Sequence, residues 1–439
     1  MDIVSYRGPH APGGVSNVLQ TVFCDPRLEL NGWWFFAKNR FNRLNQIVES
    51  SPLTLAAFSN ELVDHHYSYC NQYLWPMFHG FHEFAGYDAK LRLGYRRANR
   101  LLAQTITHSH LGTEFFIHDY QLAMVPKLLH AEGIRATSFF WHIPWPEELP
   151  IASVERALEI AQGISAAAKI CFQTEKDASN FLAFCRQYCE DSSRLEERIT
   201  VAPVPIDPEF WMILSQDQIK AQKVLQHRSI GEREKLVLSV ERADYTKGVL
   251  ERLHAIELYL RRNEHEAGSI RFLQILPRTR EGINSYDQYW QHCRQKVEAI
   301  NKTWGTHDWR PVDWIEESLS APELAVLYAR ADVMLITSIA DGLNLTAKEY
   351  VVCQQNGTGA LVLSRECGVA TELGAAAFLI DPRSAEDVVH GLSNALTAPF
   401  SERYARMRKG QEAVDRNSSS LWFARTGSSE IATPLAKVT

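Results

Sequence analysis

The sequence lacks three features that would each assign the protein to a particular class. No stretch approaches the roughly 18 consecutive apolar residues of a membrane-spanning helix. The first ten residues, MDIVSYRGPH, do not combine a charged segment with an apolar run as secretory signals do. No long basic run accompanies the net charge of −6, so the sequence does not favour nucleic acid or an anionic membrane as a partner. We therefore expect a cytoplasmic protein.

Closely spaced cysteines are also scarce. Of the eight cysteines only Cys185 and Cys189 lie near each other, four residues apart in a helical pattern, with no histidine and no second cysteine pair nearby. A structural zinc site would need such further ligands. We interpret the cysteines as buried thiols and expect no metal site.

Length and composition predict two domains, or at most three. The 439 residues, 45% of them hydrophobic, are enough for two full cores. The segment VAPVPIDP at 201–208 contains three prolines, which resist helix formation and suit a linker. We therefore expect one domain at 1–205 and another at 206–400. The remaining residues, 401–439, are expected to form a partly disordered tail that is anchored by Trp422.

In the first half of the chain, polar side chains follow directly after apolar runs that predict strands. Arg7 follows the run that begins at Ile3, and Asp119 and His142 each stand just beyond a later strand. Helical segments separate these strands, an alternation that favours a parallel, doubly wound sheet. Residues at the carboxyl ends of such strands converge on one crevice. The strands are predicted at 3–5, 115–117, 137–141 and 169–172.

The second half repeats this pattern. Strands are predicted at 236–240, 270–276, 312–315, 332–336, 360–363 and 377–380. Their carboxyl ends carry Arg242, then Arg278 and Arg280, then Asp341. The sequence therefore predicts an α/β protein with two doubly wound, Rossmann-like domains that face each other across a cleft.

The stretch SVERADYTKG, residues 239–248, places Arg242 and Lys247 at a strand-to-helix turn. A helix start offers unpaired amides and a positive dipole end to an anion. Arginine binds two phosphate oxygens with a rigid fork, and lysine adds a mobile point charge, so the pair suits a diphosphate. An ordinary solvated helix start with a lysine in its first turn is the alternative interpretation.

A second stretch, DGLNLTAKE, places Asp341 before a helix and Glu349 eight residues later. Asp341 is suited to bind sugar hydroxyls, and Glu349 is suited to accept hydrogen bonds from both hydroxyls of a ribose. The alternative is an aspartate near a helix N-cap with an ordinary surface pair of Lys348 and Glu349.

Together these stretches resemble glycosyltransferase family 20, the family of trehalose-6-phosphate synthases and glucosylglycerol-phosphate synthases. The resemblance also rests on IHDYQL at 117–122, FFWHIPWP at 139–146 and FQTEKDASNFL at 172–182, in the same order and spacing. It implies a GT-B fold, with an acceptor-binding domain at 1–205 and a nucleotide-sugar-binding domain at 206–400. It also implies transfer of glucose from a nucleotide sugar, usually UDP-glucose, to a phosphorylated acceptor, with retention and without a metal or other cofactor.

The resemblance assigns roles to individual residues. It implies that the donor is held by Gly14, Arg242, Lys247, Asp341, Gly342, Leu343, Asn344, Leu345 and Glu349. It implies an acceptor site of Arg7, Tyr67, Trp75, Asp119 and Arg280, with His142 touching the transferred glucose. Arg242, Lys247, His142 and Asp119 are then the candidate catalytic residues. Only Asp119 is placed to act as a carboxylate in the reaction, which favours a same-face displacement over a scheme with two carboxylates.

Three departures from the family pattern concern the acceptor. Ala340 replaces an arginine beside the donor site, His66 stands where the family has a phosphate-binding tyrosine, and no long helix is evident that crosses back to the first domain. Glucose 6-phosphate, giving trehalose 6-phosphate, is the expected acceptor. Glycerol 3-phosphate or a cyclitol phosphate is the alternative acceptor. A protein of another class, an inactive sugar-phosphate sensor, is the alternative to an enzyme, and a homo-oligomer is an open expectation for either.

Overall fold

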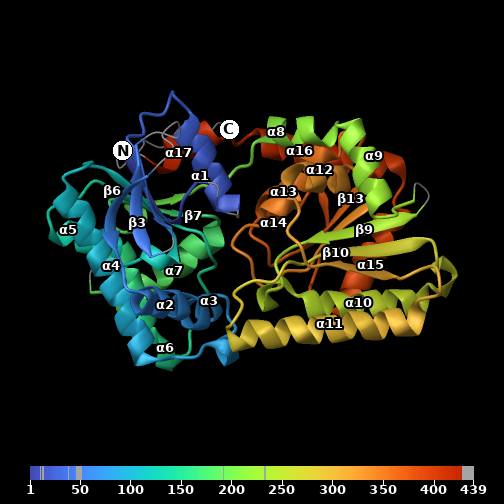
Figure 1. Ribbon diagram of the computed structural model, residues 1–439, viewed down its shortest axis with the longest axis horizontal. Helices are drawn as coiled ribbons and strands as arrows, with labels where there is room; N and C mark the ends of the chain where they lie inside the picture. The colour runs from blue at the N-terminus through green and yellow to red at the C-terminus, as the bar shows by residue number, and fades with distance from the viewer. Residues whose placement is uncertain are drawn as a thin grey trace. The chain divides into compact units, whose positions relative to one another are not determined.

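The computed structural model describes residues 1–9, 11, 14–37, 39–45, 52–190, 192–231 and 234–427. These residues form two compact units (Figure 1). Unit 1 contains Met1–Pro205 together with the described residues from Ser418 onward, and unit 2 contains Ile206–Asn417. No helix among the described residues is long and apolar enough to cross a membrane.

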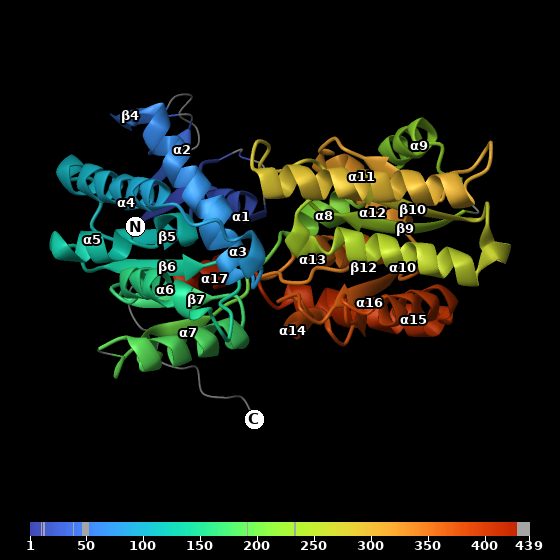
Figure 2. The ribbon, with the colours of Figure 1, turned by 90° about the horizontal axis from the view of Figure 1, so that it is seen from below.

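Unit 1 is built on an eight-stranded sheet with the strand order β4-β3-β2-β1-β5-β6-β7-β8. Strands β1, β2 and β5 to β8 are parallel, whereas β3 and β4 form an antiparallel edge. In the central register Val4 pairs with Trp34 on one side and Ile117 on the other. Figure 2 shows β5, β6 and β7 following one another across the sheet. The strands are β1(Asp2–Arg7), β2(Gly32–Ala37), β3(Arg40–Leu44), β4(Leu53–Ala57), β5(Phe115–His118), β6(Thr137–Trp141), β7(Lys169–Phe172) and β8(Ile199–Val201).

The helices of unit 1 cover this sheet with apolar faces. Helix α4, the longest of them, is capped by Asp88, and buries Tyr95, Leu102 and Ile106 at helical spacing. A π-helical turn, η1(Tyr69–Leu74), separates α2 from α3. The helices are α1(Gly14–Cys24), α2(Asn60–Ser68), α3(Trp75–Phe78), α4(Ala89–Ser109), α5(Val125–Ala131), α6(Ile151–Ile164), α7(Glu175–Tyr188) and α17(Ser419–Thr426).

Unit 2 contains a fully parallel six-stranded sheet with the order β11-β10-β9-β12-β13-β14. Its central strands are apolar on both faces because helices cover both sides. The strands are β9(Lys235–Val240), β10(Ile270–Ile275), β11(Val312–Ile315), β12(Val333–Ile336), β13(Ala360–Ser364) and β14(Ala377–Ile380). The strands predicted in this half of the sequence are confirmed to within a residue or two.

Helices α10 and α11 lie on one side of the unit 2 sheet, and α8, α9 and α12 lie on the other (Figure 1). The helices of this unit are α8(Pro208–Ser215), α9(Gln218–His227), α10(Val249–Arg262), α11(Asn284–Trp304), α12(Ala321–Arg330), α13(Leu345–Cys353), α14(Ala370–Leu373), α15(Ala385–Thr397) and α16(Phe400–Asp415). Both units therefore have the doubly wound, Rossmann-like architecture predicted from the sequence.

Of the segment 401–439, expected to be partly disordered and anchored by Trp422, the described part contains two helices. Helix α16 packs in unit 2 through buried Met407 and Val414. The chain then returns to unit 1, where Trp422 of α17 is fully buried and its Nε1 donates a hydrogen bond to the Ala202 carbonyl at 3.1 Å. The 16-residue α16 and the eight-residue α17 form this return, where the sequence analysis found no clear long helix. Residues 428–439 lie outside the described part of the chain.

Candidate active site

Three neighbouring strands of unit 2 bring two predicted donor-side residues and the predicted acceptor-side Arg280 to one edge of the sheet. Strands β10, β9 and β12 lie side by side in parallel, so their carboxyl ends meet. Arg242 follows β9, Arg280 follows β10, and Asp341 follows β12. Residues 38 to 99 positions apart in sequence are therefore neighbours at this edge. The convergence predicted from strand-end polarity is confirmed for this unit.

One buried carboxylate, that of Asp244, organises the turn after β9. Its Oδ1 accepts hydrogen bonds from the backbone N–H and the hydroxyl of Thr246, both at 3.1 Å. Its Oδ2 pairs with Arg280 at 2.7 Å and lies 3.9 Å from a guanidinium nitrogen of Arg242. Burial alone would raise the pKa of Asp244, but the cations of Arg280 and Arg242 hold it below its usual range. Asp244 thus stays ionised and holds both arginines near the turn.

The two arginines differ in exposure. The Arg280 side chain is 7% exposed and also donates to the Tyr286 hydroxyl at 2.7 Å, whereas the Arg242 side chain is 40% exposed. Arg280 has positive φ, 52°, a backbone conformation that is uncommon outside glycine. Arg242 is consequently the cation at this turn that solvent, or a bound anion, reaches most readily.

Lys247, the second predicted diphosphate cation, is paired with Asp341. Its Nζ lies 2.6 Å from Asp341 Oδ2, and that oxygen also accepts from Asn344 at 3.1 Å. Burial alone would lower the pKa of Lys247, but the adjacent Asp341 carboxylate raises it. The lysine is therefore a fixed cation, and Asp341 orients it in addition to any role toward the sugar.

The buried ion pair of Arg252 and Glu241 is connected to the partner of this lysine. Arg252 of α10 is fully buried and bonds Glu241 at 2.7 Å and the Thr337 hydroxyl at 2.9 Å. The Ser338 hydroxyl lies 3.2 Å from Glu241 and 3.3 Å from Asp341 Oδ2, which extends the network to the Lys247 partner. Because an unpaired buried charge is costly, this network fixes the loop after β12 against the turn after β9.

Gly248 lets these two loops approach each other. Its φ is +63°, and a Cβ at this position would lie 2.1 Å from the Thr337 carbonyl oxygen. Ile339 and Ala340 both donate their backbone N–H to the Thr246 carbonyl, at 2.8 and 3.2 Å. Only glycine fits this close contact without displacing the loop after β12.

Helix α13 begins directly after the Asp341 loop. Its N-cap is Asn344, with φ 85° and a side chain that accepts from the Ala347 N–H, so Asp341 stands three residues before the N-cap. Gly342 and Leu343 lie in the loop and Leu345 opens the helix. Lys348 is 1% exposed and pairs with Glu372 at 2.7 Å, which rules out a surface pair with Glu349.

Glu349 lies in the second turn of α13 and is partly buried. Its Oε2 accepts a hydrogen bond from the Tyr328 hydroxyl at 3.0 Å. Burial raises the pKa of Glu349 to about 7, although the Tyr328 bond opposes this shift. Because burial disfavours the ionised form of Glu349, hydrogen bonds from hydroxyl groups would stabilise that form.

In unit 1, Arg7, Asp119 and His142 stand at the carboxyl ends of β1, β5 and β6, which are adjacent parallel strands. Asp119 has φ 74° and accepts from the backbone N–H of Tyr120 at 2.9 Å and of His142 at 3.4 Å. Helix α1 begins at Gly14, after the same strand end as Arg7. The sequence prediction that these residues share one edge of the sheet is confirmed.

Both ring nitrogens of His142 are engaged inside the protein. Nε2 lies 3.0 Å from His118 Nδ1, and Nδ1 lies 3.2 Å from Gln173 Nε2. The ring is 7% exposed, and burial lowers the pKa of His142 to about 3. His142 is therefore neutral at physiological pH and does not act as a proton donor of the imidazolium type.

Trp75, predicted on the acceptor side, is buried and packs near Tyr120, the residue after Asp119. Its ring stacks on His79 with centroids 4.0 Å apart and lies 5.9 Å from the ring of Tyr120. Tyr67 of α2 is partly buried, and its carbonyl accepts from the Asn71 side chain at 2.8 Å. Trp75 and Asp119 are thus brought together.

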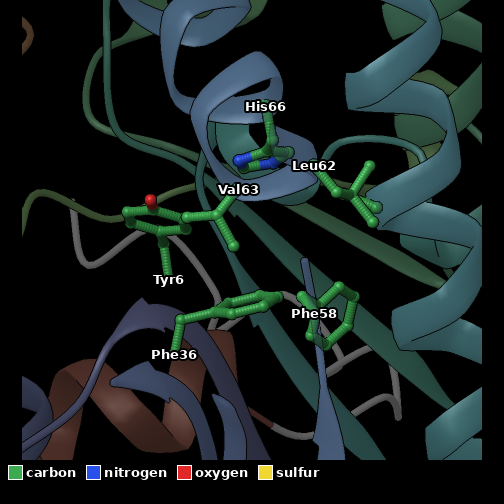
Figure 3. A pocket seen from close by; sticks show the side chains of 7 residues that line it. Tyr6, Phe36, Phe58, Leu62, Val63 and His66 are labelled. Atoms are coloured by element: carbon green, nitrogen blue, oxygen red, sulfur yellow. The ribbon is translucent and has the colours of Figure 1, made fainter. Parts of the chain in front are cut away.

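His66, at the position of the family tyrosine, is a core residue. Its ring is 3% exposed and stacks between Tyr6 and Tyr95, with centroids 5.4 Å away on each side. Nε2 donates to the Gln121 carbonyl at 2.9 Å, and burial lowers the pKa of His66 to about 4. It lines a small, mostly apolar pocket, which is shown in Figure 3. A neutral buried ring in this place cannot supply the hydroxyl of a tyrosine.

Sequence reasoning missed the residues that hold the predicted ones in place. Asp244 and Glu241 lie inside the SVERADYTKG stretch and were given no role, and His118 and Gln173 lie inside other recognised stretches. All four are buried polar side chains. His118 is the last residue of β5, and the other three stand one to four residues beyond a strand end. That position was the available signal, but their partners come from other elements of the fold.

Two Rossmann-like units, one of them with fixed cations at the turn after β9 and a buried carboxylate in α13, fit a GT-B nucleotide-sugar glycosyltransferase. The family model of glycosyltransferase family 20 matches residues 36–431. The chain belongs to this family.

Relatives and solved structures agree. A bifunctional trehalose-6-phosphate synthase/phosphatase of Thermoproteus tenax is 30% identical over 393 residues, which are 87% of this chain and 54% of the relative, so the chain spans about half of that protein. A UDP-forming α,α-trehalose-phosphate synthase of Burkholderia xenovorans, solved with glucose 6-phosphate, is 28% identical with a TM-score of 0.87, and the match covers 97% of this chain and 98% of that one. An Escherichia coli relative, solved with UDP-2-fluoroglucose, is 25% identical with a TM-score of 0.85 over 96% and 97%.

Proposed function

We propose that the protein transfers glucose from UDP-glucose to glucose 6-phosphate with retention of the anomeric configuration, giving trehalose 6-phosphate and UDP. The observation that carries this proposal is the match, along nearly the whole length of both chains, to a UDP-forming synthase that was solved with glucose 6-phosphate. The fixed cations at the β9 turn support the donor half, because a glycosyl diphosphate needs them most when its bond breaks.

Charge development explains the role of these cations. When the bond between the anomeric carbon and the diphosphate oxygen breaks, negative charge grows on the outer phosphate. Arg242, the more exposed cation, and Lys247, held by Asp341 at 2.6 Å, stabilise this charge without having to reorganise. Removing one such fixed donor costs on the order of 10²-fold in rate.

The acceptor hydroxyl needs no separate protein base in this scheme. It attacks the face of the glucose from which the phosphate departs, and its proton passes to the departing phosphate oxygen. His142 is neutral, and Asp119 is engaged with two backbone N–H groups. We assign these two residues to positioning the glucose and the acceptor. Because Arg242 and Lys247 meet the phosphate charge, the proposal includes no metal, and a chelator should leave the rate unchanged.

Product analysis by mass spectrometry tests the proposal. UDP-glucose, GDP-glucose and ADP-glucose are each offered with glucose 6-phosphate or glycerol 3-phosphate. A disaccharide phosphate from UDP-glucose and glucose 6-phosphate is expected. Arg262→Ala, which removes an exposed cation at the far end of α10, serves as a control for Arg242→Ala and should retain activity. Absence of product from every pair would overturn the proposal.

One observation favours a second acceptor. His66, at the position where the family pattern has a tyrosine near the acceptor phosphate, is buried, so that hydroxyl would have to come from the adjacent Tyr67. An acceptor with a smaller body, glycerol 3-phosphate, would depend less on that contact. Product from glycerol 3-phosphate alone would keep the donor half of the proposal and replace the acceptor.

A further inference from the structure

Gln173 is a buried polar residue that the proposed reaction does not use. It directly follows β7 and is 4% exposed. Its side-chain Oε1 accepts the backbone N–H of Val204 at 2.9 Å, and its Nε2 lies 3.2 Å from Nδ1 of His142. It therefore joins the end of unit 1 to the candidate active-site histidine.

The direction of these hydrogen bonds follows from one backbone group. The Val204 N–H can only donate, so the atom that faces it must be the amide oxygen of Gln173. The NH₂ group of Gln173 must then point at His142 and donate to Nδ1. Nδ1 of His142 consequently carries no proton.

The same reasoning applies to the neighbouring ring of His118. A neutral imidazole without a proton on Nδ1 carries it on Nε2, and His142 Nε2 lies 3.0 Å from His118 Nδ1. His142 therefore donates to His118, whose own proton lies on Nε2. That nitrogen is buried and has no hydrogen-bond partner among the described residues, so the series ends there.

We propose that Gln173 is a positioning residue that holds His142 in a single tautomer, with its proton on Nε2, and fixes the plane of the ring beside the transferred glucose. Asp119, which accepts the backbone N–H of His142, fixes the other side of the residue. Because both ring nitrogens are engaged inside the protein, the ring is held in one orientation beside the glucose.

The histidine pair is also tied to both places where the chain passes between units. Val204 lies two residues before unit 2 begins at Ile206. After the return at Ser418, Trp422 of α17 packs on His118, with ring centroids 6.3 Å apart, and its Nε1 donates to Ala202. Both crossing segments therefore contact the series formed by Gln173, His142 and His118 within unit 1.

The tautomer is measurable without any turnover. In the full-length chain labelled with ¹⁵N-histidine, the two-bond ¹H–¹⁵N spectrum at pH 7 should show His142 protonated on Nε2, with the signal assigned by its loss in His142→Asn. In Gln173→Glu the carboxylate can only accept, so a proton should appear on Nδ1. In Gln173→Met neither tautomer is preferred, and a mixture is expected.

Arg425→Gln is the matched control. It removes a bond from α17 to the Val201 carbonyl at 3.2 Å but leaves Gln173 and both histidines untouched, so the His142 signal should stay as in the parent protein. A parent spectrum with the proton on Nδ1, or an unchanged spectrum in Gln173→Glu, would overturn the proposal.

Kinetic measurements give a second test of the positioning role of Gln173, and this test rests on the proposed function. Gln173→Met should lower kcat by about 10-fold or more, because a misplaced group near the reacting atoms loses its orientation, while the acceptor KM should change by less than about twofold. Unchanged kcat together with an altered tautomer would contradict the positioning role. Because the spectrum does not depend on activity, an inactive protein with the predicted spectrum would contradict only the proposed function.

Discussion

The pairing of Asp244 with Arg280 predicts a large energetic coupling between these two residues. The Asp244 side chain is fully buried, the Arg280 side chain is 7% exposed, and they lie 2.7 Å apart. Asp244→Asn preserves the shape and the acceptor for Thr246, but it turns an NH₂ group toward the guanidinium. Leaving a buried charge without its partner costs about 3–5 kcal/mol. For a domain of this size, the Tm of unit 2 should fall by about 6–20 °C.

The double variant distinguishes pairing from separate structural roles. Arg280→Met leaves Asp244 with the Thr246 bonds and the more distant Arg242. When both charges are removed together, neither is left unpaired, so Asp244→Asn with Arg280→Met should lose at least about 2 kcal/mol less than the sum of the single variants. Scanning calorimetry of the four proteins measures this difference.

The same variants test the acceptor role of Arg280. Arg280→Met should raise the KM for glucose 6-phosphate by about 10-fold or more, because a charge-assisted bond to phosphate is lost, and should change the UDP-glucose KM by less than about twofold. Additive stability losses would refute the pairing. Equal increases in both KM values would refute the assignment of Arg280 to the acceptor.

Three further predictions follow from the other contacts. Arg242→Ala should lower kcat by about 10²-fold or more with an unchanged circular dichroism spectrum, and near-normal turnover would contradict its role at the diphosphate. Burial raises the pKa of Glu349 from 4.5 to about 7, so the folded protein holds more protons than the unfolded chain between these values, and the unfolding free energy should fall as pH rises through this range. Glu349→Gln should remove that fall in urea titrations at pH 5 and 8. Trp422→Ala should lower the unfolding free energy of unit 1 by about 3–5 kcal/mol, since the ring is fully buried, and a loss below about 1 kcal/mol would show that α17 contributes little.

The residues at the strand ends of the candidate site were predictable because the carboxyl ends of parallel strands lie at one edge of the sheet. An apolar run of three to five residues, with a polar residue within five positions of its end, located Arg7, Asp119, His142, Arg242 and Asp341 at the edges where the structure has them. This prediction needs only the sequence beside each strand, together with the knowledge that the carboxyl ends of parallel strands share one edge.

The supporting residues were not predictable in the same way because their roles depend on strand order. Asp244 pairs with Arg280 only because β9 and β10 are neighbours, and Gln173 meets His142 because β7 lies beside β6. Local sequence does not specify these neighbours.

Tertiary contacts also determine the structure of the C-terminal segment and of the antiparallel edge of the unit 1 sheet. The serine-rich composition after Asp415 pointed to disorder, but burial of Trp422 offsets the entropy of ordering α17. Strands β3 and β4 were missed because they form a short antiparallel edge whose pattern alternates weakly.

The stereochemistry of the product tests the central claim most directly. With glucose carrying ¹³C at its anomeric carbon in UDP-glucose, and unlabelled glucose 6-phosphate as acceptor, the NMR spectrum of the purified product reports the configuration of the labelled carbon. The account predicts an α,α-1,1-linked disaccharide phosphate, in which the labelled carbon keeps the α configuration of the donor. A β-configured linkage, or labelled free glucose as the main product, would contradict it.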